Sequence, residues 1–147
     1  MDNILEHSKG TKGYVFWLKS QQDNSIYLCL ADNGQTIFGN YQNDGRHTLE
    51  IDGNEAQAIR LANEGYSTKN KLNMNNRGFG IRTSKRMLVS GLGGSFFMLS
   101  GGGFHRFDDY VNDYADISKF MHWNGTILLL RIPCHIPRGF NFYDYLE

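Results

Sequence analysis

The order of the apolar segments along this chain constrains its fold more than any single motif does. Runs at 14–18 and 26–31 have the length and composition of strands, and the polar turn between them predicts a hairpin. Further strand-like runs follow near the end of the chain, at 95–100, 104–107 and 126–132. Because helical segments and hairpin-linked strands segregate, we expect an α+β fold. Its form would be a two-layer α/β sandwich, with helices on one face of a mixed, mostly antiparallel sheet.

Helical spacing occurs in three segments, which are 2–9, 55–64 after Asn54 as N-cap, and 79–90. Residues 32–53 are rich in Asn, Asp and Gly without a long periodic run, so we expect a loop there. We interpret 108–122, which carries several Asp and Tyr residues, as an insertion between strands. The chain is expected to be one domain, residues 1–147, whose first helix is truncated at its N-terminal end.

Composition excludes several classes of protein. With 40% hydrophobic and 14% aromatic residues, the chain has enough apolar side chains to build a core. Its formal net charge is zero, which gives no global reason to bind nucleic acid or an anionic membrane. No apolar run approaches the ~20 residues that span a bilayer. Cys29 and Cys134 lie in apolar runs and are predicted to be buried free thiols, which favours a cytoplasmic location.

A polar segment bounded by glycines is the strongest local signal for a ligand. It begins with Gly65-Tyr66-Ser67-Thr68-Lys69 and ends with Arg77-Gly78-Phe79-Gly80, where a helical pattern starts. Glycine permits close approach of the backbone, and the free N–H groups of a helix N-terminus favour an anion. The segment therefore predicts a loop that wraps phosphates.

Four segments together resemble the GHKL superfamily of ATP-binding domains, which have the Bergerat α/β fold. They are Asp2-Asn3 to His7 on the first helix, Asp32-Asn33-Gly34-Gln35-Thr36 after a strand, the glycine-bounded segment as lid, and Gly125-Thr126 opening a later strand. Taken singly, each also fits a surface helix, a turn or a solvated loop, and it is their order that carries the resemblance. It spans nearly the whole chain.

The resemblance implies a role for each residue in binding ATP or ADP with Mg²⁺. Asn3 would ligate the Mg²⁺ ion, and His7, one helical turn later, would face the same pocket. Asp32 would accept a hydrogen bond from the adenine amino group, and Gly34 would let the backbone turn beneath the base. The remaining nucleotide contacts would come from Ser67, Thr68, Lys69, Arg77, Gly78, Gly80 and Thr126.

Two departures from the family pattern leave the activity open. Thr36 replaces the second glycine of the Asp-x-Gly-x-Gly turn, so either the local backbone differs from the family pattern or Thr36 avoids positive φ. Relatives that hydrolyse ATP carry a Glu four residues before the helix Asn, and this chain begins only two residues before Asn3. Hydrolysis, phosphate transfer to a protein partner or another domain, and a degenerate domain that acts only as a protein-interaction module therefore all stay open.

Overall fold

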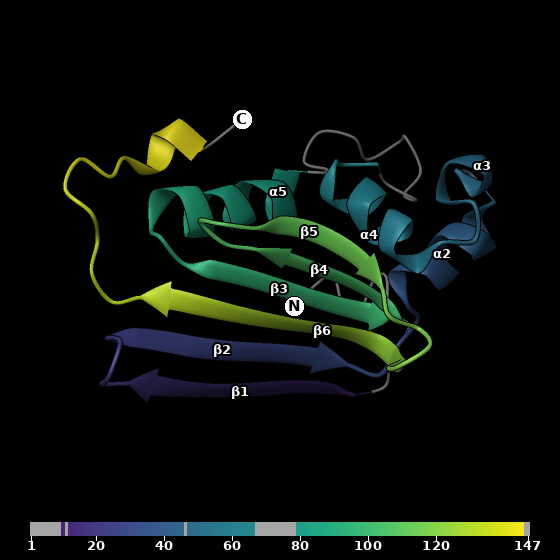
Figure 1. The fold of residues 1–147 in the computed structure, drawn as a ribbon, viewed down its shortest axis with the longest axis horizontal. Helices are drawn as coiled ribbons and strands as arrows, with labels where there is room; N and C mark the ends of the chain where they lie inside the picture. The colour runs from purple at the N-terminus through teal and green to yellow at the C-terminus, as the bar shows by residue number, and fades with distance from the viewer. Residues whose placement is uncertain (1–9, 11, 46, 67–78, 146–147) are drawn as a thin grey trace.

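The computed structural model describes residues 10, 12–45, 47–66 and 79–145. These residues form a six-stranded sheet in the order β1-β2-β6-β3-β4-β5, and every neighbouring pair is antiparallel (Figure 1). The strands are β1 (Gly13–Ser20), β2 (Ser25–Asp32), β3 (Ser95–Gly101), β4 (Gly103–Phe107), β5 (Asn112–Asp116) and β6 (Trp123–Pro133). The described sheet is therefore antiparallel throughout and not mixed as expected.

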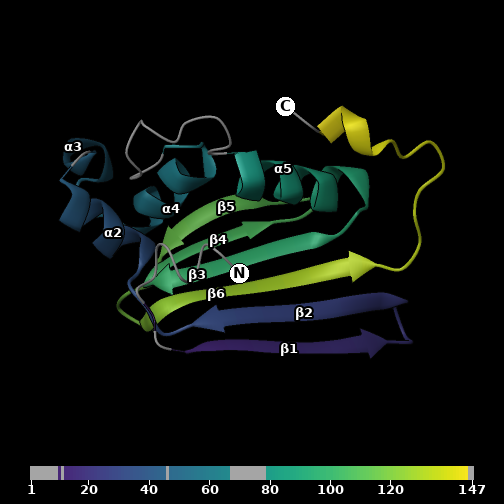
Figure 2. The ribbon, with the colours of Figure 1, turned by 180° about the vertical axis from the view of Figure 1, so that it is seen from behind.

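The helices lie together on one side of this sheet, as Figures 1 and 2 show. They are α2 (Ile37–Asp44), α3 (Thr48–Ile51), α4 (Glu55–Asn63), α5 (Phe79–Arg86), the π-helical turn η2 (Met87–Gly91) and the 3₁₀ turn η3 (Phe142–Tyr145). Their contacts with the sheet are mainly to β3, β4 and β5, while β1 and β2 extend beyond them. The predicted α+β, two-layer arrangement is confirmed. In the described part of the chain, no helix combines the length and apolar character needed to cross a bilayer.

The predicted strands and the two later helices are present. The β1–β2 hairpin forms as expected, with Trp17 opposite Leu28. The N-cap prediction for α4 is confirmed, because the Asn54 side chain accepts from the Gln57 N–H at 3.0 Å. The predicted helix at 79–90 begins as α5 and continues as the π-helical turn η2.

The expectation of a loop over 32–53 is wrong, because α2 and α3 lie within it. Thr36 caps α2, its hydroxyl accepting from the Gly39 N–H at 2.9 Å. Tyr41 and Ile51 are buried with Ala58 and Leu61 of α4 in a small apolar cluster. Burial against α4 thus outweighs the unfavourable helix propensity of the Asn, Asp and Gly residues around them.

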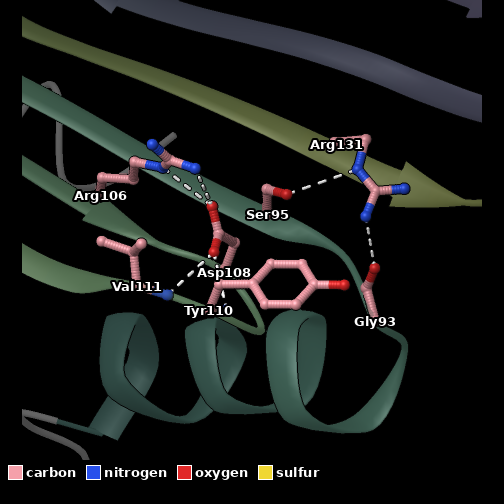
Figure 3. A network of polar contacts seen from close by, with 7 residues as sticks. All are labelled: Gly93, Ser95, Arg106, Asp108, Tyr110, Val111 and Arg131. Carbon is pink, nitrogen blue, oxygen red and sulfur yellow. Dashed lines mark hydrogen bonds and ion pairs between the residues drawn. The ribbon is translucent and has the colours of Figure 1, made fainter.

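The expectation of an insertion at 108–122 is also wrong, because β5 lies inside it and forms an edge of the sheet. The turn that leads into β5 is held by Asp108, whose Oδ1 accepts from the N–H groups of Tyr110 and Val111 at 2.9 and 3.0 Å (Figure 3). Its Oδ2 pairs with the Arg106 guanidinium at 2.7 Å. The Tyr110 backbone hydrogen bond, followed by Arg106, lowers the pKa of Asp108.

The main core lies between the helices and the centre of the sheet. It contains Ile59 of α4, Leu88 and Val89 of η2, and Phe96 and Met98 of β3. The core is completed by every second side chain of β6 on the face toward the helices, namely Leu128, Leu130 and Ile132. At the same end of the sheet as the Asp108 turn, the Arg131 guanidinium donates to the Gly93 carbonyl at 2.6 Å and to Ser95 Oγ at 3.4 Å (Figure 3).

Lys85 is a buried amine on the core side of α5. It is 8% exposed, and its Nζ lies 5.8 Å from the ring centroid of Phe96 and 5.6 Å from that of Phe107. Burial, followed by repulsion from Arg82, lowers the pKa of Lys85 to about 8. The folded state therefore holds the protonated amine less readily than the unfolded chain does.

We expect Lys85→Met to raise the free energy of unfolding at pH 7 by about 1–2 kcal/mol, since the charged form is penalised in the core and solvent screening reduces that penalty. The wild-type protein should gain stability as the pH rises from about 8, the pKa of Lys85 in the folded state, towards 10.5, the ordinary pKa of a lysine. Urea unfolding at pH 7 and pH 10 measures both effects. A Met variant less stable than wild type at pH 7 would contradict this account.

Candidate functional site

Three polar side chains form a row across neighbouring strands at one end of the sheet. Thr126 of β6 pairs with Ser100 of β3. On the other side of β6, Ala31 pairs with Ile127, so Asp32 and Thr126 are the next residues along β2 and β6. Because side chains alternate along a strand, the three share the face on which Leu128 meets the helices. The chain thus brings 32, 100 and 126 together from distant parts of its sequence.

The carboxylate of Asp32 is buried but only partly used. Asp32 is 6% exposed, and its Oδ1 accepts from the Gly34 N–H at 2.8 Å, which closes the turn after β2. Its backbone carbonyl accepts from the Trp123 indole N–H at 2.8 Å. Within the described part of the chain, Oδ2 has no hydrogen-bond donor. A carboxylate that is fixed through one oxygen can accept a hydrogen bond from a ligand with the other.

The Ser100 hydroxyl connects the row to helix α2. Ser100 is 1% exposed, and its Oγ accepts from the Ile37 N–H at the start of α2 at 2.9 Å. The Ser100 hydroxyl donates to the Gly125 carbonyl at 3.0 Å, and its oxygen lies 3.1 Å from Thr126 Oγ1. Because the only proton of Ser100 goes to that carbonyl, the Thr126 hydroxyl donates to Ser100 Oγ.

Gly125 lets β6 approach Asp32 closely. Its φ is +118°, and a Cβ at this position would overlap the carbonyl group of Asp32. Thr36 has φ −68° and ψ 159° and serves as the N-cap of α2, so its backbone avoids positive φ. Glycine is therefore required at 125, where the two strands approach closely, whereas the extended backbone at 36 accommodates a threonine.

The structure brings together three of the predicted site residues, namely Asp32, Gly34 and Thr126. Gly80 lies in the first turn of α5. The other predicted site residues lie outside the described part of the chain, and these are Asn3, His7, Ser67, Thr68, Lys69, Arg77 and Gly78.

Sequence reasoning missed Ser100 and Trp123 as parts of this site. A polar residue that ends the apolar run 96–99 was the available signal for Ser100. The indole of Trp123 reaches across to residue 32, and no local pattern indicates such a contact.

The two thiols are free as predicted, but the expectation that both are buried is wrong. Cys29 is partly buried in β2, whereas Cys134 is exposed because it follows the end of β6. No group of three or more His, Cys, Asp or Glu side chains among the described residues is arranged to hold a metal ion. The predicted Mg²⁺ ligand, Asn3, lies outside these residues.

A second polar cluster is buried between α4 and the β4–β5 hairpin. Asn63 Nδ2 donates to His105 Nδ1 at 3.1 Å and to the Tyr114 hydroxyl at 3.3 Å. His105 Nε2 donates to Asn112 Oδ1 at 2.9 Å, and its ring stacks on Tyr114 with centroids 4.0 Å apart. Both ring nitrogens of a neutral His105 are satisfied in this way. Burial lowers the pKa of His105 to about 4.

Comparison of the chain with protein-family models, with curated proteins and with solved structures gave no match. The assignment of a function therefore depends on the chemistry of the residues that the fold brings together. Both buried polar clusters contain an acceptor without a donor among the described residues, which is Asn63 Oδ1 beside His105 and Asp32 Oδ2 in the row. We choose the row at Asp32 because a carboxylate oxygen accepts a stronger hydrogen bond than an amide oxygen does.

We expect Ser100→Ala to lower the free energy of unfolding by about 1–3 kcal/mol, because it leaves the partly buried Ile37 N–H without its acceptor. Ser90→Ala is the matched control, since Ser90 is exposed and its loss should change stability by less than about 0.5 kcal/mol. Chemical denaturation compares the two variants. Equal effects would show that the Ser100 hydroxyl does not hold this end of the sheet.

We also expect stability to fall as the pH drops from about 6.5, the ordinary pKa of a histidine, towards about 4, the pKa of His105 in the folded state. In this window the unfolded chain binds a proton that the folded state excludes. His105→Gln should remove this part of the pH dependence, although it lowers stability at pH 7. Unfolding of both proteins at several pH values tests this, and parallel stability curves would refute the assignment to His105.

Proposed function

We propose that this chain binds an adenine nucleotide at the row formed by Asp32, Thr126 and Ser100, as an ATP-binding domain of the GHKL type with the Bergerat fold. The observation that carries the proposal is the Asp32 carboxylate, which is buried, fixed through Oδ1 and left with Oδ2 to accept. The motif order of the sequence supports it independently, because the patterns around Asp32, Gly34 and Thr126 indicate these residues without any knowledge of how the strands pair.

The chemistry of the row suits adenine better than guanine. Adenine presents an exocyclic amine, a donor, beside a ring nitrogen, an acceptor. Asp32 Oδ2 would accept from the amine, and the ring nitrogen would take its donor from elsewhere, because the Thr126 proton goes to Ser100. Guanine would place a carbonyl oxygen against the carboxylate, which leaves two acceptors unpaired and costs affinity.

The phosphates would extend from this row towards the glycine-bounded segment 65–80. The Lys69 and Arg77 side chains of that segment would supply charge-assisted hydrogen bonds to the phosphate oxygens. Mg²⁺ would enter as the ion that accompanies the phosphates, with Asn3 as its protein ligand. Closure of the segment over a nucleotide would couple the bound state to a protein partner or to another domain.

Thermal unfolding with ATP, ADP or GTP, each with and without Mg²⁺, tests the proposal. ATP at ten- to hundredfold excess over its Kd should raise the free energy of unfolding by about 1–3 kcal/mol, with a smaller rise for GTP. Asp32→Asn should lose both the ATP effect and the preference for adenine, because Oδ2 no longer offers a charged acceptor.

Asp109→Asn is the control, since this exposed carboxylate lies in the β4–β5 turn at the opposite end of the sheet. It should respond to ATP as the wild-type protein does. A wild-type protein that millimolar ATP does not stabilise would refute the proposed function. An Asp32→Asn protein with unchanged ATP affinity would refute the placement of the base.

A further inference from the structure

The free edge of the sheet at β1 is long and strongly apolar. In the described part of the chain, β1 pairs only with β2, so its outer side offers backbone N–H and C=O groups to another strand. Five consecutive large apolar side chains, residues 14 to 18, are each 43% to 65% exposed in spite of their size. Exposed edges of this kind are templates for pairing with another chain.

The opposite edge of the same sheet, at β5, has features that disfavour pairing with another chain. β5 has only five residues and carries Asp113 and Asp116, and α4 packs beside it. β1 has eight residues, no carboxylate and one charge, Lys19 near its end. Short length and charge are the devices that natural sheets use against edge pairing, and β1 has little of either.

We propose that β1 joins two copies of this chain, pairing antiparallel with β1 of the second copy across a twofold axis at Phe16. Residues that face each other across an antiparallel pair lie on the same side of the sheet. A register centred on Phe16 therefore sets Phe16 against Phe16 of the second copy, Tyr14 against its Leu18, and Val15 against its Trp17. Every large side chain of the strand meets an apolar one, which a self-complementary interface requires.

Space and charge favour a second copy as the occupant of this edge. The helices cover β3 to β5 and stop short of β1, so two copies can pair their edges without collision between their helical layers (Figures 1 and 2). A chain with zero formal net charge does not repel another copy of itself. Five large side chains from each copy offer on the order of 100 Å² of exposed surface apiece, which sets an upper limit of ~1,000 Å² on the side-chain area of the interface, at the low end of specific interfaces.

Sedimentation velocity of the whole chain between about 1 and 100 μM tests the proposal. The wild-type protein should shift from monomer to dimer over this range. Phe16→Glu should raise the dimer dissociation constant at least tenfold, because two carboxylates then face each other at the axis, and Phe16→Lys should do the same. An equimolar mixture of these two variants should recover the dimer, since Glu and Lys then meet across the axis.

Phe120→Glu is the matched control, because Phe120 is 90% exposed and lies in the turn before β6. It should dimerise like the wild-type protein. A wild-type chain that stays monomeric at 100 μM would overturn the proposal, whether or not another protein binds the edge. A dimer that survives Phe16→Glu, or variants that fail to rescue each other when mixed, would also overturn it.

Discussion

The pairing of β6 with strands on both of its sides is the constraint on which the rest of the structure depends. The N-terminal hairpin supplies β1 and β2, and the later segment supplies β3, β4 and β5. Only β6, the last strand of the described chain, joins these two halves of the sheet. The row of Asp32, Thr126 and Ser100 runs across this junction, so the candidate site exists only when both seams have formed. Pairing across such sequence separations is entropically costly, and the apolar run of β6 offsets that cost by burial.

Local patterns were sufficient to predict the elements that carry strong apolar periodicity. The β1–β2 hairpin, α4 with its Asn54 cap, and the strands β3, β4 and β6 all follow from signals within a few residues. Sequence reasoning failed where tertiary contact outweighs composition. α2 and α3 are held by burial of Tyr41 and Ile51 against α4. β5 reads as a polar insertion because it is an edge strand whose exposed side chains need not be apolar.

In the candidate site, too, single residues could be predicted from local sequence, but their proximity in space could not. Asp32 and Gly34 could be found because a turn directly follows a strand, and Thr126 because Gly125 precedes it at the opening of another. Their proximity follows from the register of β2, β6 and β3, which sequence patterns do not specify. Ser100 and Trp123 each form a hydrogen bond to a partner that is distant in sequence, by 63 and 91 residues, and such contacts produce no periodic pattern in the sequence.

The two proposals meet on the β1–β2 hairpin. Asp32 ends β2, and its backbone neighbour in β1 is Gly13, while Phe16 lies three residues further along the same edge. Because the hairpin contacts the rest of the sheet mainly through β6, its position relative to Thr126 depends on the pairing of β2 with β6. A second copy paired with β1 would order this hairpin from its outer side, and a ligand at Asp32 would order it from its end. Each event restricts the motion of the hairpin, so the event that follows loses less conformational entropy. Dimerisation and nucleotide binding should therefore favour each other, even if the contacts at the β1 edge and at Asp32 stay the same.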